Sequence, residues 1–335
     1  MRNAILIAFF YALIAVGCNN VKNDPATKAP LYQLKVERFD SAFFSMDTLQ
    51  TKIEIEKLLK AYPNFSQDFI TRILLLKRVD DTEGIKLFYR TYLPIYKEVQ
   101  KVNAIKIAMP ALEDAFRRLQ FYFPKYALTH KVVFFVGPLE SYGNIITSDA
   151  LAIGLQMHMG ATSKWYYDDH IQTIYPSYLS RRYTPDYIAI SSLQNIVSDI
   201  YLPSNKAQSL IAQMVEAGKI QYIINACFPN TADSIRLGYT NEHCLNLKNQ
   251  EGKIWTYLLH EKLIYSTNPI DIDNFMQDAA FNNVLGESLP GNIGKYIGYE
   301  IVDAWMHQKA QKGISMEALL NTSADKIFEA AAYNP

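Results

Sequence analysis

The sequence predicts a predominantly helical α+β fold in which a small sheet is flanked by helices. Apolar residues recur at helical spacing over most of the chain, and a short β-rich stretch interrupts them between about residues 128 and 158. No repeat or low-complexity segment divides the 335 residues. We therefore expect a single domain over residues 32–335, helical to about residue 127, with a strand pair and further helices over 128–335.

Residues 1–17 have the features of a secretory signal peptide. Arg2 supplies the positive charge, and an apolar run too short to span a bilayer comfortably leads to "AVGC", which ends on Cys18. This ending is similar to a bacterial lipobox, although Ala15 stands where Leu is usual. We expect a lipid on Cys18 that attaches the mature protein to a membrane, and a flexible tether over residues 18–31. The alternative is an uncleaved anchor followed by an ordinary cysteine.

The N-terminal part should contain one strand followed by helices. "YQLKVERFD" alternates in hydropathy, which predicts an edge strand. The first helical segment should break near Pro63, and the second should kink or stop at Pro94. The third should begin near Pro110 and stop at Pro124, because proline lacks an amide hydrogen and is best tolerated in the first helical turn.

The β-rich stretch should supply three strands. "HKVVFFVG" reads as one strand, and "NIITSDALAIGLQMHMG" reads as two strands with a turn at Ser148 and Asp149. A tyrosine-rich loop follows. Helical patterns then return in four segments, over residues 185–201, 206–228, 251–265 and 290–310.

Composition and motif spacing argue against several functions. Lys and Arg number 33, as do Asp and Glu, and no basic stripe is present, so we expect no nucleic-acid partner. "LLHEKLIY" contains His260 and Glu261, but Ile264 stands where a zinc-binding His-Glu-x-x-His helix needs its second His. We interpret this stretch as a coincidence. His158 and His170 could meet across the tyrosine-rich loop, but we expect no bound metal, no cofactor and no catalytic residue.

Cys227 and Cys244 remain in the predicted mature protein besides Cys18. Cys227 lies in an apolar run, which favours a buried thiol. A bridge between Cys227 and Cys244 is the alternative, because the cell envelope permits disulfides.

Several motifs occur in a specific order along the chain: "KVERFD", "LAIGLQMHMG", "YPSYLSRRYTPDYI", "EAGKIQYIINACFP", "GYTNE" and "LPGNIGKYIGYEIV". With the lipobox, they resemble the GldB family, the gliding-motility-associated lipoproteins of the Bacteroidetes. Asn292 departs from that family, which usually has Arg at this place. The resemblance implies an outer-membrane lipoprotein on the periplasmic face, with protein partners in the gliding and associated secretion machinery.

The family in turn distantly resembles gluzincin-type zinc peptidases, but the family has lost their zinc motif. On this resemblance, the helix at 187–201 corresponds to the motif helix, and Glu216 stands where a third zinc ligand would be. That helix contains no His. The resemblance therefore implies a degenerate zinc-metallopeptidase-like core, in which Arg181 or Arg182 could neutralise Glu216. Glu216 could instead be an ordinary surface residue or an ion-pair partner.

Three functions remain open: a non-catalytic envelope lipoprotein, a module that binds a peptide or glycan in the ancestral cleft, and an active zinc metallopeptidase. For the cleft we expect His158, Glu216 and Tyr239 to lie near one another, beside an edge strand formed by "LAIGLQMH". Further candidate cleft residues come from the tyrosine-rich loop: Tyr166, Tyr167, Tyr175 and Arg182.

Overall fold

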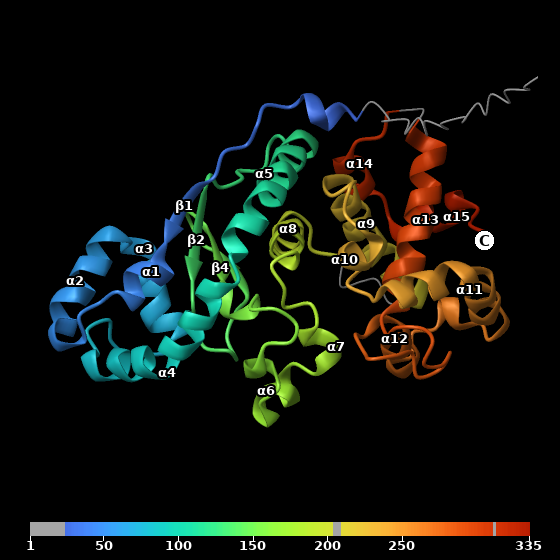
Figure 1. The fold of residues 1–335 in the computed structure, drawn as a ribbon. Coiled ribbons are helices and arrows are strands. Elements are labelled where there is room, and N and C mark those ends of the chain that lie inside the picture. The colour runs from blue at the N-terminus through green and yellow to red at the C-terminus, as the bar shows by residue number, and fades with distance from the viewer. Residues whose placement is uncertain (1–23, 204–208, 311–312) are drawn as a thin grey trace, which may run out of the picture.

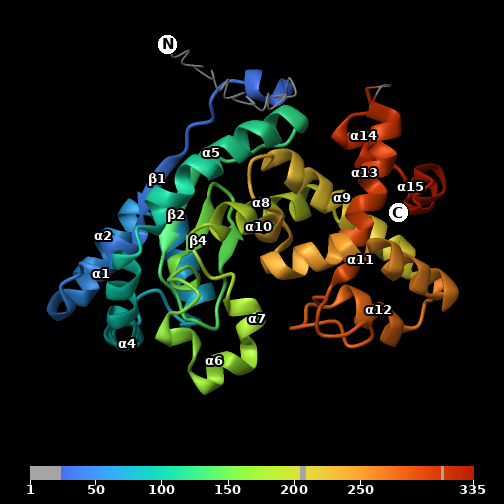
Figure 2. The same cartoon turned by 45° about the vertical axis from the view of Figure 1, so that its right-hand side comes forward.

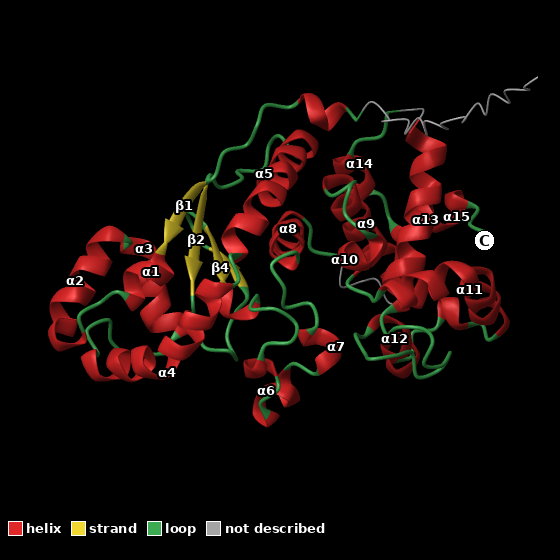
Figure 3. Cartoon of the chain, viewed as in Figure 1, coloured by secondary structure: helices red, strands yellow, loops and turns green. Residues whose placement is uncertain are grey.

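The computed structural model describes residues 24–203, 209–310 and 313–335. The expected signal peptide and Cys18 lie outside these ranges. Within them, helices surround one small sheet, which confirms the predicted α+β class (Figure 3). Figures 1 and 2 place the sheet with α1–α5 on one side of the molecule and α9–α15 on the other, with α8 between them.

The sheet has four strands in the order β1-β2-β4-β3. β1, β2 and β4 are parallel, and β3 runs antiparallel to β4. The predicted edge strand β1 and the predicted pair β3–β4 are confirmed. The expectation that "LAIGLQMH" forms an edge is wrong, because β4 pairs with β2 on one side and β3 on the other. Their bounds are β1 (Lys35–Arg38), β2 (Lys131–Phe135), β3 (Asn144–Ile146) and β4 (Leu151–Gly154).

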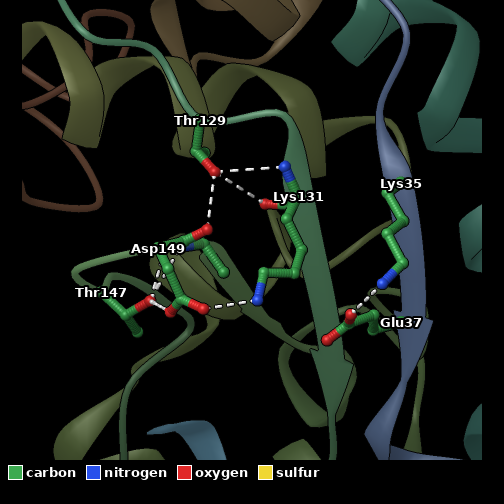
Figure 4. A network of polar contacts seen from close by, with 7 residues as sticks. Lys35, Glu37, Thr129, Lys131, Thr147 and Asp149 are labelled. Atoms are coloured by element: carbon green, nitrogen blue, oxygen red, sulfur yellow. Dashed lines mark hydrogen bonds and ion pairs between the residues drawn. The ribbon is translucent and has the colours of Figure 1, made fainter. Parts of the chain in front are cut away.

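A polar network ties the beginning of β2 to the turn between β3 and β4 (Figure 4). The Thr129 hydroxyl donates to the Asp149 carbonyl at 3.0 Å and accepts from the Lys131 amide at 3.1 Å. The Lys131 ammonium contacts the Asp149 carboxylate and lowers the pKa of that carboxyl. Thr147 donates to the Ala150 carbonyl at 2.9 Å, so the turn is closed by its own side chains.

The N-terminal helices pack around a cluster of phenylalanines. The Phe39 ring lies 4.9 Å from Phe65 and 4.8 Å from Phe69, both edge-on, and all three side chains are buried. A π-helical turn, Phe69–Ile73, carries Phe69 into this cluster. The helices are α1 (Phe39–Phe44), α2 (Thr51–Ala61), α3 (Pro63–Asp68), α4 (Thr82–Lys101) and α5 (Ala104–Tyr122).

Proline marks only some of the helix boundaries. Pro63 is at the start of α3, so the predicted break is confirmed. Pro94 lies inside α4 and Pro110 inside α5, so the predicted interruption at Pro94 and the predicted helix start near Pro110 are wrong. A proline removes one backbone hydrogen bond, and burial of the apolar face of each long helix outweighs that cost.

The four helices predicted after the sheet are present as α8, α9, α11 and α13, with one large shift of a boundary, whereas the shorter helices α6, α7, α10, α12, α14 and α15 were not predicted. α11 begins ten residues before the expected helix at 251, because the Thr240 side chain caps it by accepting from the His243 amide. The helices are α6 (Asp169–Ile174), α7 (Ser177–Ser180), α8 (Tyr187–Ile200), α9 (Leu210–Cys227), α10 (Asp233–Leu237), α11 (Asn241–His260), α12 (Pro269–Met276), α13 (Ile293–Ala310), α14 (Met316–Asn321) and α15 (Ala324–Ala331).

α9 connects two hydrophobic cores. Its C-terminal end, including Ile224 and Cys227, packs into the core around the sheet, and its first half, including Met214, packs into a second core with α11, α13 and α15. α9 and α13 meet at glycines. A Cβ on Gly218 would lie 2.1 Å from the Gly298 carbonyl oxygen, so the two backbones are in direct contact.

The segment from Asp24 to Ala29, here called the N-terminal strap, packs against α5. Its 3-10 helix, Pro25–Lys28, is capped by Asp24 and buries Ala26 completely. Asp24 forms an ion pair with Arg118 of α5. The sequence places these residues in a flexible tether, whereas the folded body extends at least to Asp24, because α5 offers both an arginine and a site for Ala26.

Candidate functional site

Glu216 is buried in an ion pair within α9. The residue is 7% exposed, and its Oε1 accepts a hydrogen bond from Lys219 Nζ at 2.8 Å. Its Oε2 accepts from the Tyr201 hydroxyl at 2.5 Å. The prediction that Arg181 or Arg182 neutralises Glu216 is wrong, because Lys219 lies one helical turn away on the same face.

The Glu216 site joins three parts of the fold. Tyr201 follows α8, and its hydroxyl also lies 3.2 Å from Lys219 Nζ, which is 3.5 Å from the carbonyl of Leu320 in α14. Glu216 therefore faces the end of α8, as the ancestral-cleft hypothesis requires. Its oxygens are, however, occupied by neighbouring side chains, and a buried pair of this kind is costly to break.

His158 and Tyr166 are core residues behind the carboxyl end of β4. His158 is 4% exposed, and its Nδ1 donates to the Thr184 carbonyl at 3.1 Å. Burial lowers the pKa of His158 to about 4, so the imidazole is neutral at pH 7. The Tyr166 hydroxyl donates to the Gln156 carbonyl at 2.7 Å and accepts from the Met159 amide at 3.0 Å. Tyr166 thus fixes the chain after β4 and does not wall a groove.

The other candidate tyrosines are dispersed. Tyr167 is 58% exposed, whereas Tyr239 is 2% exposed. The Tyr175 ring packs edge-on against Tyr183 at 5.4 Å. The Tyr239 hydroxyl donates to the Asn292 carbonyl at 2.6 Å. Glu216, His158 and Tyr239 therefore each contact a different group of residues. They do not line one common cleft.

Arg181 and Arg182 instead belong to a second polar site, here called the cationic cluster, together with Lys295 and Asp278. Arg182 Nη1 pairs with Asp278 Oδ2 at 3.0 Å, and its Nε donates to the Gly238 carbonyl at 3.0 Å. Arg181 donates to the same carbonyl.

Lys295 enters the cationic cluster from α13. Its Nζ donates to the Leu237 carbonyl at 2.6 Å and lies 5.1 Å from the centre of the Tyr239 ring. Gly238, with φ +73°, leaves room for the arginines, because a Cβ there would be 3.0 Å from Arg182 Nε. The cationic cluster therefore joins the loop after α7 to the end of α10 and the start of α13.

Asn292, the residue that departs from the expected Arg, lies at the rim of the cationic cluster. Its backbone is left-handed, with φ +55°, and its Nδ2 donates to Asp278 Oδ1 at 3.2 Å. Asp278 thus accepts a hydrogen bond from Asn292 on one carboxylate oxygen and from Arg182 on the other. Burial alone would raise the pKa of Asp278, but Arg182, Lys295 and Asn292 together outweigh burial and lower it.

The residues expected for a zinc site are not assembled in the described part of the chain. In residues 24–203, 209–310 and 313–335, no three His, Cys, Asp or Glu side chains are grouped so as to hold a metal ion. In α8, Asn195 donates to Asn144 and Ser192 is buried. The His260 side chain is 82% exposed at the end of α11. Cys227 and Cys244 are free, buried thiols, so the disulfide alternative is wrong.

Two hollows lie outside the set of residues that the sequence predicted for a cleft. One of about 680 Å³ lies between α3 and β3, and the exposed Tyr142 is at its wall. Another of about 360 Å³ lies between the ends of α5, α8 and α14, beside Tyr201. Sequence reasoning missed both hollows, and it also missed Lys219 and Lys295. The i, i+3 spacing of Glu216 and Lys219 was a readable signal.

One family model, described as gliding motility protein GldB, matches residues 20–335. No curated protein and no solved structure matches the chain. Among the described residues, no helix combines the length and apolarity needed to cross a membrane. Because the match covers almost the whole chain, this protein belongs to the GldB family of gliding-motility lipoproteins.

Proposed function

We propose that this protein is a non-catalytic lipoprotein of the gliding-motility and associated secretion machinery, anchored through Cys18 on the periplasmic face of the outer membrane. Family membership supports the process, and the lipobox supports the anchor. The observation that carries the proposal is the N-terminal strap, because it joins the expected anchor to the folded body over a very short distance.

Only residues 19–23 separate Cys18 from Asp24. A fully extended chain rises at most about 3.6 Å per residue, so the strap starts within about 20 Å of the lipid. The ion pair between Asp24 and Arg118, and the hydrogen bond from Arg117 Nη1 to the Thr27 carbonyl at 2.8 Å, then hold the strap on α5. The folded domain would thus be held close to the membrane with one side, that of α5, facing it. Such an arrangement suits a component of an assembly at the membrane surface.

The anchor is tested by changing Cys18 to Ala. We expect the variant to lack acyl chains and to disappear from the outer-membrane fraction, while Cys244→Ala, a matched control, stays there. Mass spectrometry of the N-terminus and sucrose-gradient fractionation measure the two properties. A Cys18→Ala protein that still sediments with the outer membrane without acyl chains would refute the anchor.

The non-catalytic character is supported by the state of Glu216. A general acid or base must reach the reacting atoms of a substrate, and both Glu216 oxygens contact Lys219 or Tyr201 instead. We expect the purified full-length lipoprotein to hold no stoichiometric zinc and to cleave no peptide in a chelator-sensitive manner. Metal analysis that finds about one tightly held zinc per chain would overturn this part of the proposal.

A second candidate function, peptide or glycan binding, is favoured by the hollow between α3 and β3. Tyr142 is 60% exposed at its wall, and Asn64, Gln67 and Arg72 supply polar groups opposite. Binding of peptidoglycan fragments and of extended peptides can be measured by calorimetry on the full-length lipoprotein. Tyr142→Ser should weaken whichever ligand binds there, and the exposed Tyr265→Ser should not. Equal ligand affinities in both variants would exclude this hollow as the binding site.

A further inference from the structure

The cationic cluster carries more positive than negative charge. Arg181, Arg182 and Lys295 contribute three positive charges, and Asp278 contributes one negative charge. The other described partners of the three cations are uncharged: the carbonyl oxygens of Leu237 and Gly238, the Tyr187 side chain, which hydrogen-bonds Arg181, and the Tyr239 ring, which lies against Lys295. Carbonyls satisfy hydrogen bonds but carry only partial charges, so about two positive charges remain uncompensated.

The start of α13 adds to this positive potential. α13 is an 18-residue helix that begins at Ile293, and its first turn contains no acidic residue. The positive end of a helix dipole favours negative groups, yet Lys295 occupies that first turn. A lysine at this end of a helix is unfavourable unless an anion lies nearby.

The three cations are partly buried, and solvent reaches at least the Arg182 side chain. Arg181, Arg182 and Lys295 are all half-buried, and the Arg182 side chain is 22% exposed. Burial lowers the pKa of Arg181, and the neighbouring Arg182 lowers it further. Burial and then Arg182 lower the pKa of Lys295 to about 8. Partial removal from water strengthens the attraction between these cations and any anion that enters.

Donor geometry also leaves capacity for a ligand. A guanidinium has five N–H donors, and Arg181 and Arg182 share one carbonyl acceptor, that of Gly238. Two adjacent guanidinium groups with an ammonium group suit the tetrahedral oxygens of phosphate. A phosphate dianion would balance both uncompensated charges, whereas a monocarboxylate would balance only one.

We propose that the cationic cluster binds the phosphate group of a small soluble anion, at the seam between the loop after α7 and the start of α13. A phospholipid headgroup of the anchoring membrane is disfavoured as the ligand, because the proposed anchor would hold that membrane near the N-terminal strap. This step rests on the proposed function. Figures 1 and 2 show α7 and α12 at one end of the molecule and the N-terminal strap near the other.

The test is a calorimetric titration of the detergent-solubilised full-length lipoprotein with inorganic phosphate, at ionic strength held constant with sodium chloride. We expect saturable binding of one phosphate per chain. Arg182→Gln and Lys295→Gln should each weaken it roughly tenfold or more, the range for loss of one charged hydrogen bond. Asp278→Asn should strengthen it, because the only carboxylate of the cationic cluster is removed. Arg78→Gln, which breaks an exposed ion pair with Asp80, is the matched control and should leave the affinity unchanged.

Three further arms complete the design. Sodium acetate should bind at least tenfold more weakly than phosphate. Vesicles of phosphatidylglycerol should not compete with phosphate. If Arg182→Gln fails to fold, Lys295→Gln and Asp278→Asn decide through their opposite effects. The proposal is overturned if phosphate does not saturate, if Arg78→Gln weakens binding as much as Lys295→Gln, if Asp278→Asn weakens it as well, or if only the vesicles bind.

Discussion

Lys219 is 1% exposed, and its ammonium lies 2.8 Å from the carboxylate of Glu216. Charges are removed from water at a large cost, so a buried pair stabilises the fold only as a pair. The Tyr201 hydroxyl donates to the same carboxylate and completes its hydrogen bonding. At this scale, the residue that was expected as a relic of zinc binding serves to hold α9 against the end of α8.

Removing one member of this pair should cost much more than removing both. Glu216→Gln and Lys219→Met should each lower the free energy of unfolding by about 3–5 kcal/mol, because each leaves one buried charge unpaired. The double variant Glu216→Gln/Lys219→Met should lose less than either single variant. Urea denaturation measures all three, and Tyr201→Phe, expected to cost about 1 kcal/mol, is the control. Single variants within 1 kcal/mol of the parent would contradict a buried pair.

His158 should make the protein sensitive to acid. The pKa of His158 in the folded protein is about 4, which is below its ordinary value. As pH falls from 6.5 to 4, His158 therefore binds a proton in the unfolded chain but not in the folded one. His158 therefore lowers stability over this window, by up to about 3 kcal/mol. His158→Gln should lose less stability than the parent between these pH values in denaturation curves. Exposed His260→Gln is the control, and parallel pH profiles of parent and His158→Gln would count against this reading.

Single-residue environments were only partly predictable. Glu216 and Lys219 are three residues apart on a helix, so their pairing was readable from the sequence. The pair between Arg182 and Asp278 spans 96 residues, and local patterns carry no information about such a contact. His158 stood out as a candidate ligand because its type was visible, whereas its burial against Thr184 was not.

At the scale of elements, the contact between α9 and α13 depends on the absence of side chains. A Cβ on Gly298 would lie 1.7 Å from the Met214 carbonyl oxygen, and one on Gly218 would be nearly as close to the Gly298 carbonyl. Glycine lowers helix propensity by about 1 kcal/mol relative to alanine, so both helices give up intrinsic stability to approach this closely. This contact between the two helices belongs to the second core.

Gly298→Ala should therefore be strongly destabilising. The two helices would have to separate, which opens the packing of the second core, and we expect a loss of about 3 kcal/mol or more. Gly252→Ala in α11 is the matched control, since its Cβ would meet only the terminal Pro335 at 3.2 Å. Thermal unfolding followed by circular dichroism compares the two. A Gly298→Ala midpoint equal to that of Gly252→Ala would contradict the close contact.

Element types were easier to predict than their partners. The alternation in "YQLKVERFD" and the apolar run in "HKVVFFVG" indicated strands because these patterns are local. The interior place of β4 depends on pairing with β2, about twenty residues earlier, which the sequence does not encode locally. The prolines misled for a related reason, since tertiary packing keeps α4 and α5 helical through Pro94 and Pro110.

At the scale of the whole molecule, the N-terminal strap ties the start of the folded chain to α5, which packs on both α8 and α9. Ala26 is completely buried in this attachment. The strap thus determines which side of the body lies next to the proposed lipid, although it contributes few residues to either hydrophobic core.

A charge at Ala26 should release the strap and leave the body folded. Ala26→Asp would bury a carboxylate without a partner, so the strap should leave α5. We expect rapid protease cleavage between residues 24 and 34, seen by mass spectrometry, with a thermal midpoint close to the parent value. Lys28→Ala, a change at an exposed strap position, is the control. Resistance of Ala26→Asp to cleavage would show that the attachment does not depend on Ala26.

The position of the strap also determines how the protein would carry a mechanical load. A pull on the N-terminus acts first on the Asp24–Arg118 pair and then on β1, which lies at the edge of the sheet and is parallel to β2. A force along β1 loads its backbone hydrogen bonds with β2 in shear, so that several must break together. Under such a load, the strap and β1 would pass the force from the proposed anchor to the sheet, and the second core would not lie on that path.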